Sequence, residues 1–161
     1  MGFSVQRTSR SYVRPSAATP SGALELSVID RVVGLHHLVR SLHVFAAPVA
    51  GSQDHARSPA RAVRDALGKA LVDYYPFAGR LVDGAGGPGV SRVECTSEGA
   101  WFVEATAAFS LDDAGRLDQY PYVIPEDDLL PDAAPDVEPL DLPLAMQVQI
   151  YILTTMVQGC Q

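Results

Sequence analysis

The sequence has no apolar run long enough to cross a membrane. A transmembrane helix needs about 20 consecutive apolar residues, and no stretch of the 161 residues approaches that length. The N-terminus, with Arg7, Arg10 and Arg14 among polar residues, also lacks the apolar core of a secretory signal. Because 47% of the residues are hydrophobic and 19% are charged, the composition is that of a globular chain. We therefore expect a soluble cytoplasmic protein with no membrane partner.

Cysteine is rare, and positive charge is not clustered. Cys95 and Cys160 match no metal-binding or redox spacing, so we expect ordinary thiols and no bound metal. Residues 1–80 hold ten Lys and Arg against five Asp and Glu, a net charge of +5, whereas residues 81–161 hold two against fourteen, a net charge of -12. The basic residues are dispersed and form no dense run for binding phosphates. Nucleic acid is therefore not an expected partner.

The histidines offer no recognisable catalytic arrangement. Acyl transfer commonly uses a general-base His with an Asp four positions later. That position is occupied by another residue type after each histidine: Arg40 after His36, Ser41 after His37, Ala47 after His43 and Pro59 after His55. The sequence also contains no Gly-x-Ser-x-Gly elbow, phosphate loop, dinucleotide fingerprint or His-Glu-x-x-His site. No catalytic residue is therefore assigned.

Helical and strand patterns occur in separate parts of the chain. Residues 3–13 alternate as a strand does, and Val39 to Phe45, rich in β-branched and aromatic residues, predicts a second strand. Ser58 is placed as the N-cap of a helix with Pro59 at its first position, and Pro76 ends this helix.

The second half of the chain predicts a hairpin, a connection and a final strand. Val90 to Cys95 and Trp101 to Ala105 flank a turn and predict a β-hairpin. Residues 112–143 carry ten acidic residues, one basic residue and six of the twelve prolines, which predicts a long surface connection. Met146 to Val157 is rich in Ile, Val, Thr and Tyr and predicts a strand.

Four stretches, in order, resemble one enzyme family. Tyr74-Tyr75-Pro76-Phe77-Ala78-Gly79-Arg80-Leu81 follows the helix and is similar to the Tyr-Pro-x-x-Gly-Arg motif of the plant BAHD acyl-CoA-dependent acyltransferases. Leu26 to Asp30 resembles the family's Leu-Ser-x-x-Asp, residues 95–105 resemble its hairpin, and Pro143 to Val148 resembles the strand leading to its catalytic segment. The resemblance covers residues 3–148. The opening, from Gly2 to Phe45, looks most like grass hydroxycinnamoyl-CoA transferases.

The resemblance implies a fold and a reaction. The fold would be α/β, a partial N-terminal domain of a chloramphenicol-acetyltransferase-like two-domain fold, with a mixed sheet and flanking helices. In the family, an acyl group, here a hydroxycinnamoyl group, moves from acyl-CoA to an alcohol or amine. Acyl-CoA is a co-substrate, and no bound cofactor is expected. The chain is expected to be a monomer.

Two family motifs are missing from these residues. The His-x-x-x-Asp motif, whose histidine takes the acceptor's proton, and the Asp-Phe-Gly-Trp-Gly motif do not occur. We therefore expect residues 1–148 to form an incomplete N-terminal acyltransferase domain that is inactive alone. The alternative is a non-catalytic fragment that binds ligand or an intact homologue.

The resemblance also assigns roles to individual residues. Ser41 and His43 fall where related hydroxycinnamoyl transferases place residues near substrate, and strand packing is the alternative for both. Five motif residues are expected to be structural: Asp30, Tyr75, Pro76, Gly79 and Arg80. Among these, Gly79 would permit a tight turn, and Arg80 would anchor a carboxylate or backbone carbonyls.

Residues 149–161 diverge from the family pattern. The residues that follow Gln147-Val148 can be encoded by a splice-donor-like sequence with AT-rich codons after it. This suggests that the tail is translated intron. The transcript aligned to genomic DNA tests the hypothesis, because an exon junction after Gln149 that encodes these same residues would contradict it.

Overall fold

Two three-stranded sheets organise the computed structural model, which describes residues 3–32, 37, 39–45, 58–83, 90–115, 117 and 120–151. His36, His55, Cys160 and residues 152–161 lie outside the described residues. The elements in chain order are β1 (Val5–Val13), β2 (Gly22–Glu25), α1 (Pro59–Asp73), the 3-10 helix η3 (Tyr75–Ala78), β3 (Arg80–Asp83), β4 (Val90–Cys95), β5 (Ala100–Ala107), α2 (Glu126–Leu129), the 3-10 helix η4 (Pro139–Asp141) and β6 (Ala145–Tyr151).

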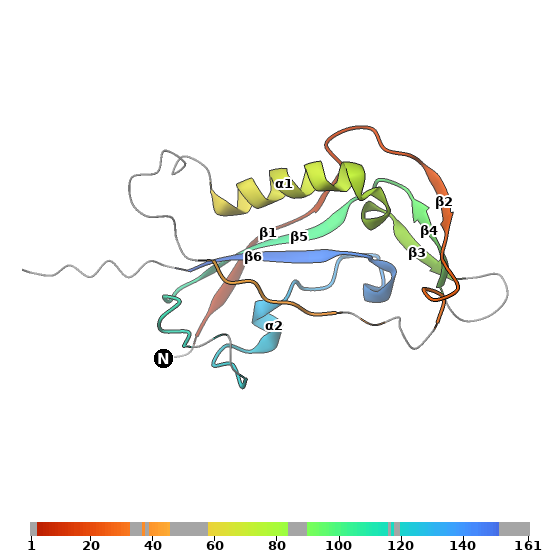
Figure 1. Cartoon of the computed structure of the whole chain (residues 1–161). Coiled ribbons are helices and arrows are strands. Elements are labelled where there is room, and N and C mark those ends of the chain that lie inside the picture. The colour runs from red at the N-terminus through yellow and green to blue at the C-terminus, as the bar shows by residue number, and fades with distance from the viewer. Residues whose placement is uncertain are drawn as a thin grey trace, which may run out of the picture.

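The larger sheet is mixed and has β5 at its centre. Its strand order is β1-β5-β6, with β1 antiparallel and β6 parallel to β5. The smaller sheet, ordered β2-β4-β3, is antiparallel throughout and lies beside the end of α1 (Figure 1). The predicted α/β class and mixed sheet are confirmed. Among the described residues, no helix combines the length and apolar composition that crossing a membrane requires.

The predicted hairpin between β4 and β5 is wrong. Both strands exist, but β4 pairs with β2 and β3, whereas β5 pairs with β1 and β6. The linking turn contains Ser97 and Gly99, both with positive φ, at 57° and 108°. This turn carries the chain from one sheet to the other, because both edges of each strand are already occupied.

Helix α1 covers one face of the larger sheet (Figure 1). Leu67 and Leu71, four positions apart and therefore on one face of the helix, pack with Val13 and Phe102 in a single buried cluster. The predicted start is confirmed, with Ser58 at the N-cap and Pro59 in the first turn, although the Ser58 side chain makes no capping hydrogen bond.

The connection between β5 and β6 covers the opposite face. Ala134 and Leu142 of this connection are buried against Trp101 and Val103 of β5, and the Trp101 indole Nε1 donates a 2.8 Å hydrogen bond to the Asp132 carbonyl oxygen. The expectation that residues 112–143 merely cross the surface is therefore wrong. The strand β5 has apolar side chains on both faces, so a second layer must exclude water from the face that α1 does not reach.

Residues 39–45 do not form the predicted strand. All seven residues are exposed, and none belongs to a strand. Residue composition favours a strand here, but a strand needs a hydrogen-bonded neighbour, and no described strand pairs with this segment. The final predicted strand is present as Ala145–Tyr151. It continues past residue 148, and the proposed domain boundary there stays a prediction.

Replacing Phe102 with Ala is expected to lower the free energy of unfolding by about 3–5 kcal/mol, because it leaves a cavity at the centre of the core. Phe102 is 0% exposed and Phe45 is 84% exposed, so Phe45→Ala is the matched control. Chemical denaturation of both variants measures the difference. Equal losses would contradict the position assigned to β5.

Candidate functional site

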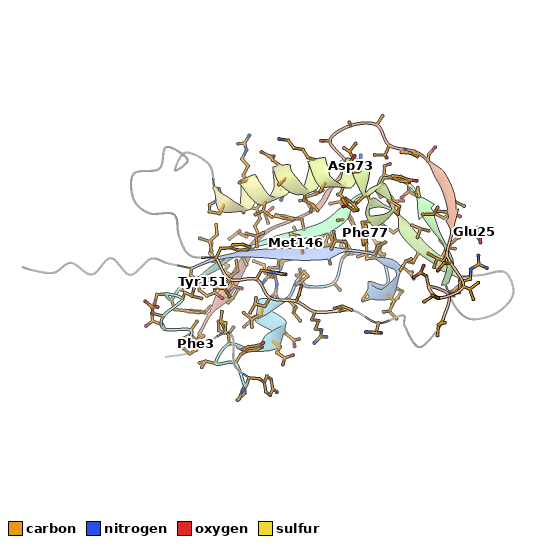
Figure 2. All side chains as sticks on the ribbon, in the orientation of Figure 1. Phe3, Glu25, Asp73, Phe77, Met146 and Tyr151 are labelled. Carbon is orange, nitrogen blue, oxygen red and sulfur yellow. The ribbon has the colours of Figure 1, made fainter. Side chains whose placement is uncertain are left out.

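The segment Tyr75–Arg80 lies where α1 and the two sheets meet. Helix α1 ends as the Tyr74 N–H donates to the Ala70 carbonyl at 2.9 Å, and Pro76 then lies in the first turn of η3. Figure 2 shows Phe77 beside the end of α1, which Asp73 marks, close to the smaller sheet. The chain enters β3 two residues after Ala78, the buried residue of η3.

Gly79 is required by a close approach between two backbone segments. Its N–H donates to the Pro76 carbonyl at 3.0 Å, so it closes the η3 turn. Its φ of -95° is one that any residue adopts, so the reason given from the sequence, turn conformation, is corrected. A Cβ at this position would lie 3.0 Å from Val93 Cγ1 and closer still to the Glu94 carbonyl oxygen. Only glycine lets β3 begin this near β4.

Arg80 fixes the turn between the two sheets. Its Nη1 donates to the carbonyl oxygens of Gly79 and Gly99, at 2.7 and 3.0 Å, and its Nη2 lies 3.1 Å from a Glu98 carboxylate oxygen. The guanidinium carbon lies 5.0 Å from the centre of the Tyr12 ring. With 12% of its side chain exposed, Arg80 joins β3, the β4–β5 turn and β1 at one place.

Asp30 stabilises a separate local turn. The Ser27 hydroxyl donates to Asp30 Oδ2 at 2.7 Å and accepts from the Asp30 N–H at 3.3 Å. The Arg31 N–H donates to the Ser27 carbonyl at 3.2 Å. Ser and Asp side chains commonly hold turns in this way. This motif therefore shapes the chain after β2.

Ser41 and His43 lie outside two hollows that the described residues form. Both are exposed on the extended segment 39–45. One hollow of about 370 Å³ lies between residues 14–19 and Thr96 to Glu98, and another of about 330 Å³ lies at the far end of the larger sheet beside Tyr151. Neither is lined by Ser41 or His43, and the substrate role of both residues stays a prediction.

Arg7 and Gln147 are structural residues that the sequence analysis missed. The Arg7 Nε donates to Gln147 Oε1 at 3.3 Å, and its Nη2 donates to the carbonyls of Asp127 and of Leu130, the latter at 3.1 Å. The Gln147 Nε2 donates to the Asp128 carbonyl at 2.8 Å. These bonds hold α2 against β1 and β6. The available signal was the inward position of Arg7 in the alternating strand, where a charge needs partners.

Four ionisable groups in the described residues have shifted pKa values, and none makes a reactive centre. The Glu94 carboxylate, which accepts a hydrogen bond from the Arg92 guanidinium, raises the pKa of Arg92. Burial raises the pKa of the Cys95 thiol, with the nearby Glu94 charge as a smaller cause, and burial also raises the pKa of the Tyr151 phenol. Both groups therefore stay protonated at neutral pH. Hydrogen bonds from the Ser110 hydroxyl and backbone N–H lower the pKa of Asp113. Within the described ranges, no group of three or more His, Cys, Asp and Glu residues has the arrangement of a metal site.

Comparisons with known proteins agree on one family. The model of the Transferase family matches residues 3–155. The chain is 70% identical over 151 residues to Acyl transferase 4 of Oryza sativa subsp. japonica, covering 92% of this chain and 34% of that protein. It is 40% identical to the myricetin 3-O-glucosyl 1,2-rhamnoside 6'-O-caffeoyltransferase AT2 of Crocosmia x crocosmiiflora, covering 92% and 33%.

A solved structure has a similar fold. The crystal structure of vinorine synthase matches with a TM-score of 0.57 and 25% identity, covering 92% of this chain and 35% of that one. The chain thus spans about a third of the length of the curated relatives it matches.

Replacing Arg80 with Lys is expected to lower the free energy of unfolding by about 1.5–3 kcal/mol, because an ammonium cannot reproduce the forked bonds to two carbonyls. Glu98→Gln is the control. Because the Glu98 side chain is 51% exposed, its loss should cost less than about 1 kcal/mol. Urea unfolding of both variants tests this, and a larger effect at Glu98 would contradict the carbonyl-anchoring role.

Proposed function

Because this chain belongs to the Transferase family, the BAHD acyltransferases, we propose that it supplies part of the scaffold of a hydroxycinnamoyl-CoA-dependent acyltransferase. The reaction would move a hydroxycinnamoyl group from a coenzyme A thioester to an alcohol or amine. The observation that carries the proposal is the 70% identity to an acyl transferase across 92% of this chain. The caffeoyltransferase that is 40% identical favours a hydroxycinnamoyl donor, since a caffeoyl group is one.

The chain's own contribution would be to position β6. Arg7 and Gln147 hold this strand against α2, and β6 runs parallel to the buried centre of the sheet. By the resemblance described above, the corresponding strand of the family leads to the histidine that takes the acceptor's proton. A strand fixed on one face by α1 and on the other by the connection would hold that group in a constant place.

The proton acceptor itself would have to come from elsewhere. No His-x-x-x-Asp sequence occurs in the 161 residues, and a general base of this kind contributes about 10²- to 10⁴-fold to the rate. We therefore propose that the 161-residue polypeptide does not transfer acyl groups by itself. Ser41 and His43 would lie near substrate only in an assembly that covers their exposed segment.

The purified 161-residue chain is expected to release no coenzyme A from caffeoyl-CoA or p-coumaroyl-CoA with any of a panel of alcohols and amines. The measurement is product detection by mass spectrometry, with intact Acyl transferase 4 assayed in parallel. Sustained product formation by the chain alone would contradict the assignment of the general base to other residues.

A chimera tests the proposed acyl donor independently of whether the 161-residue chain is active by itself. Residues 3–151 of this chain would replace the matching segment of Acyl transferase 4, and the 70% identity makes correct packing the expected outcome. We expect the chimera to use hydroxycinnamoyl-CoA with a kcat/KM at least about tenfold above that for acetyl-CoA, the ratio that a differential transition-state stabilisation of about 1.4 kcal/mol produces. A folded chimera that prefers acetyl-CoA would contradict the proposed substrate class.

A further inference from the structure

Ser58 carries an exposed hydroxyl group that the fold does not use. It occupies the N-cap position of α1, where a serine side chain ordinarily accepts a hydrogen bond from the first turn, yet it makes no such bond. Both Ser58 and the following Pro59 are exposed. The Ser58 hydroxyl is therefore accessible to a modifying enzyme.

The residues that follow Ser58 form a pattern that proline-directed protein kinases recognise. Pro59 has no N–H group, which suits a kinase whose peptide site does not require that donor, and Arg61 supplies a positive charge three positions after Ser58. Arg61 is exposed, and none of the described residues pairs with its guanidinium. The sequence Ser58-Pro59-Ala60-Arg61 thus presents a phosphate acceptor, a proline and an accessible cation in the required order.

We propose that Ser58 is a phosphorylation site for a proline-directed kinase. The Ser58 Oγ attacks the γ-phosphorus of ATP, so a bond forms between Oγ and phosphorus while the bond from that phosphorus to the β–γ bridging oxygen breaks, and ADP leaves. The hydroxyl proton passes to the catalytic aspartate of the kinase. The inference goes beyond the proposed acyl transfer and does not depend on it, because no acyl-CoA takes part in this reaction.

The first turn of α1 contains no negative charge that would stabilise the start of the helix. None of its residues is acidic, and Arg61 places a positive charge beside the positive end of the helix dipole. A phosphate on Ser58 adds a charge of about −1.5 to −2 at pH 7 and three acceptor oxygens, which can accept hydrogen bonds from the N–H groups of the first turn. Phosphorylation therefore stabilises α1, the helix that covers one face of the larger sheet (Figure 1).

A kinase reaches Ser58 once the first turn of α1 opens. Kinases bind their substrate residues in an extended conformation, so Pro59 to Arg61 must leave the helix. This opening breaks the 3.0 Å hydrogen bond from the Ala62 N–H to the Ser58 carbonyl and exposes Ala60, which is 1% exposed in the folded chain. Moving one methyl group into water costs little, and helix ends open more readily than helix centres.

Thr19-Pro20 provides a matched comparison within the same chain. Thr19 is the other hydroxyl residue that is followed directly by proline, but its Oγ1 lies 2.7 Å from the Ser97 Oγ and shares a hydrogen bond with it. The third residue after Thr19 is Gly22, so the pattern has no cation at that position. A kinase that recognises the residues at Ser58 is therefore expected to modify Thr19 much more slowly.

Phosphorylation of the purified 161-residue chain by a cyclin-dependent kinase and ATP tests the site, with tandem mass spectrometry locating the phosphate. We expect Ser58 to be modified at least about tenfold faster than Thr19. Arg61→Gln should slow the reaction at Ser58 at least about fivefold, because the cation is lost, whereas Lys69→Gln, at another exposed position of α1, should leave the rate unchanged. No modification of Ser58, equal rates at Ser58 and Thr19, or equal effects of the two α1 variants would overturn the proposal.

Thermal unfolding measures the consequence for α1. The phosphorylated chain should have a Tm about 1–4 °C above that of the unmodified chain, the shift that a favourable charge at a helix N-terminus produces in a domain of this size. The difference should shrink at high salt, because salt screens exposed charges. Ser58→Ala should keep the Tm of the unmodified chain, since the hydroxyl makes no capping bond. A Tm that falls or stays constant on phosphorylation would overturn the stabilising role.

Discussion

The side chains on both faces of β5 must be shielded from water, and the remaining elements are arranged to meet this requirement. Trp101, Phe102 and Val103 are consecutive, so their side chains alternate between the two faces of the sheet, yet none is more than 4% exposed. Helix α1 covers one face and the proline-rich connection covers the other. Arg80, which donates to the carbonyl oxygens of Gly79 and Gly99, then fixes the smaller sheet at the end where β5 begins.

The sequence predicted an element correctly where the residues that specify it lie within the element itself. Helix α1 could be predicted because Ser58, Pro59 and the spacing of Leu67 and Leu71 lie within the helix and its cap. The pairing of β4 could not be predicted, since a turn between two strands predicts a hairpin whenever their other edges are free. Here the edges are occupied by strands distant in sequence, β2 and β3 on one sheet and β1 and β6 on the other.

The candidate site, too, could be predicted from the sequence only in part. The motif around Tyr75 to Arg80 identified the junction, but its energetics depend on partners that the motif does not contain, such as the carbonyl of Gly99 and the ring of Tyr12. Gly79 shows the difference clearly. Its presence in the motif suggested turn conformation, whereas the structure attributes it to the proximity of Glu94. Arg7, outside every motif, proved to hold α2 in place.

The buried central strand β5 and the exposed residues 39–45 are the two extremes of the described structure, and native-state hydrogen exchange of the 161-residue chain compares them most directly. The amides of Phe102 and Val103 should exchange slowest, with protection near that of global unfolding, whereas the amides of residues 39–45 should exchange at close to the unprotected rate. Strong protection of residues 39–45 in the isolated chain, or fast exchange throughout β5, would contradict the account.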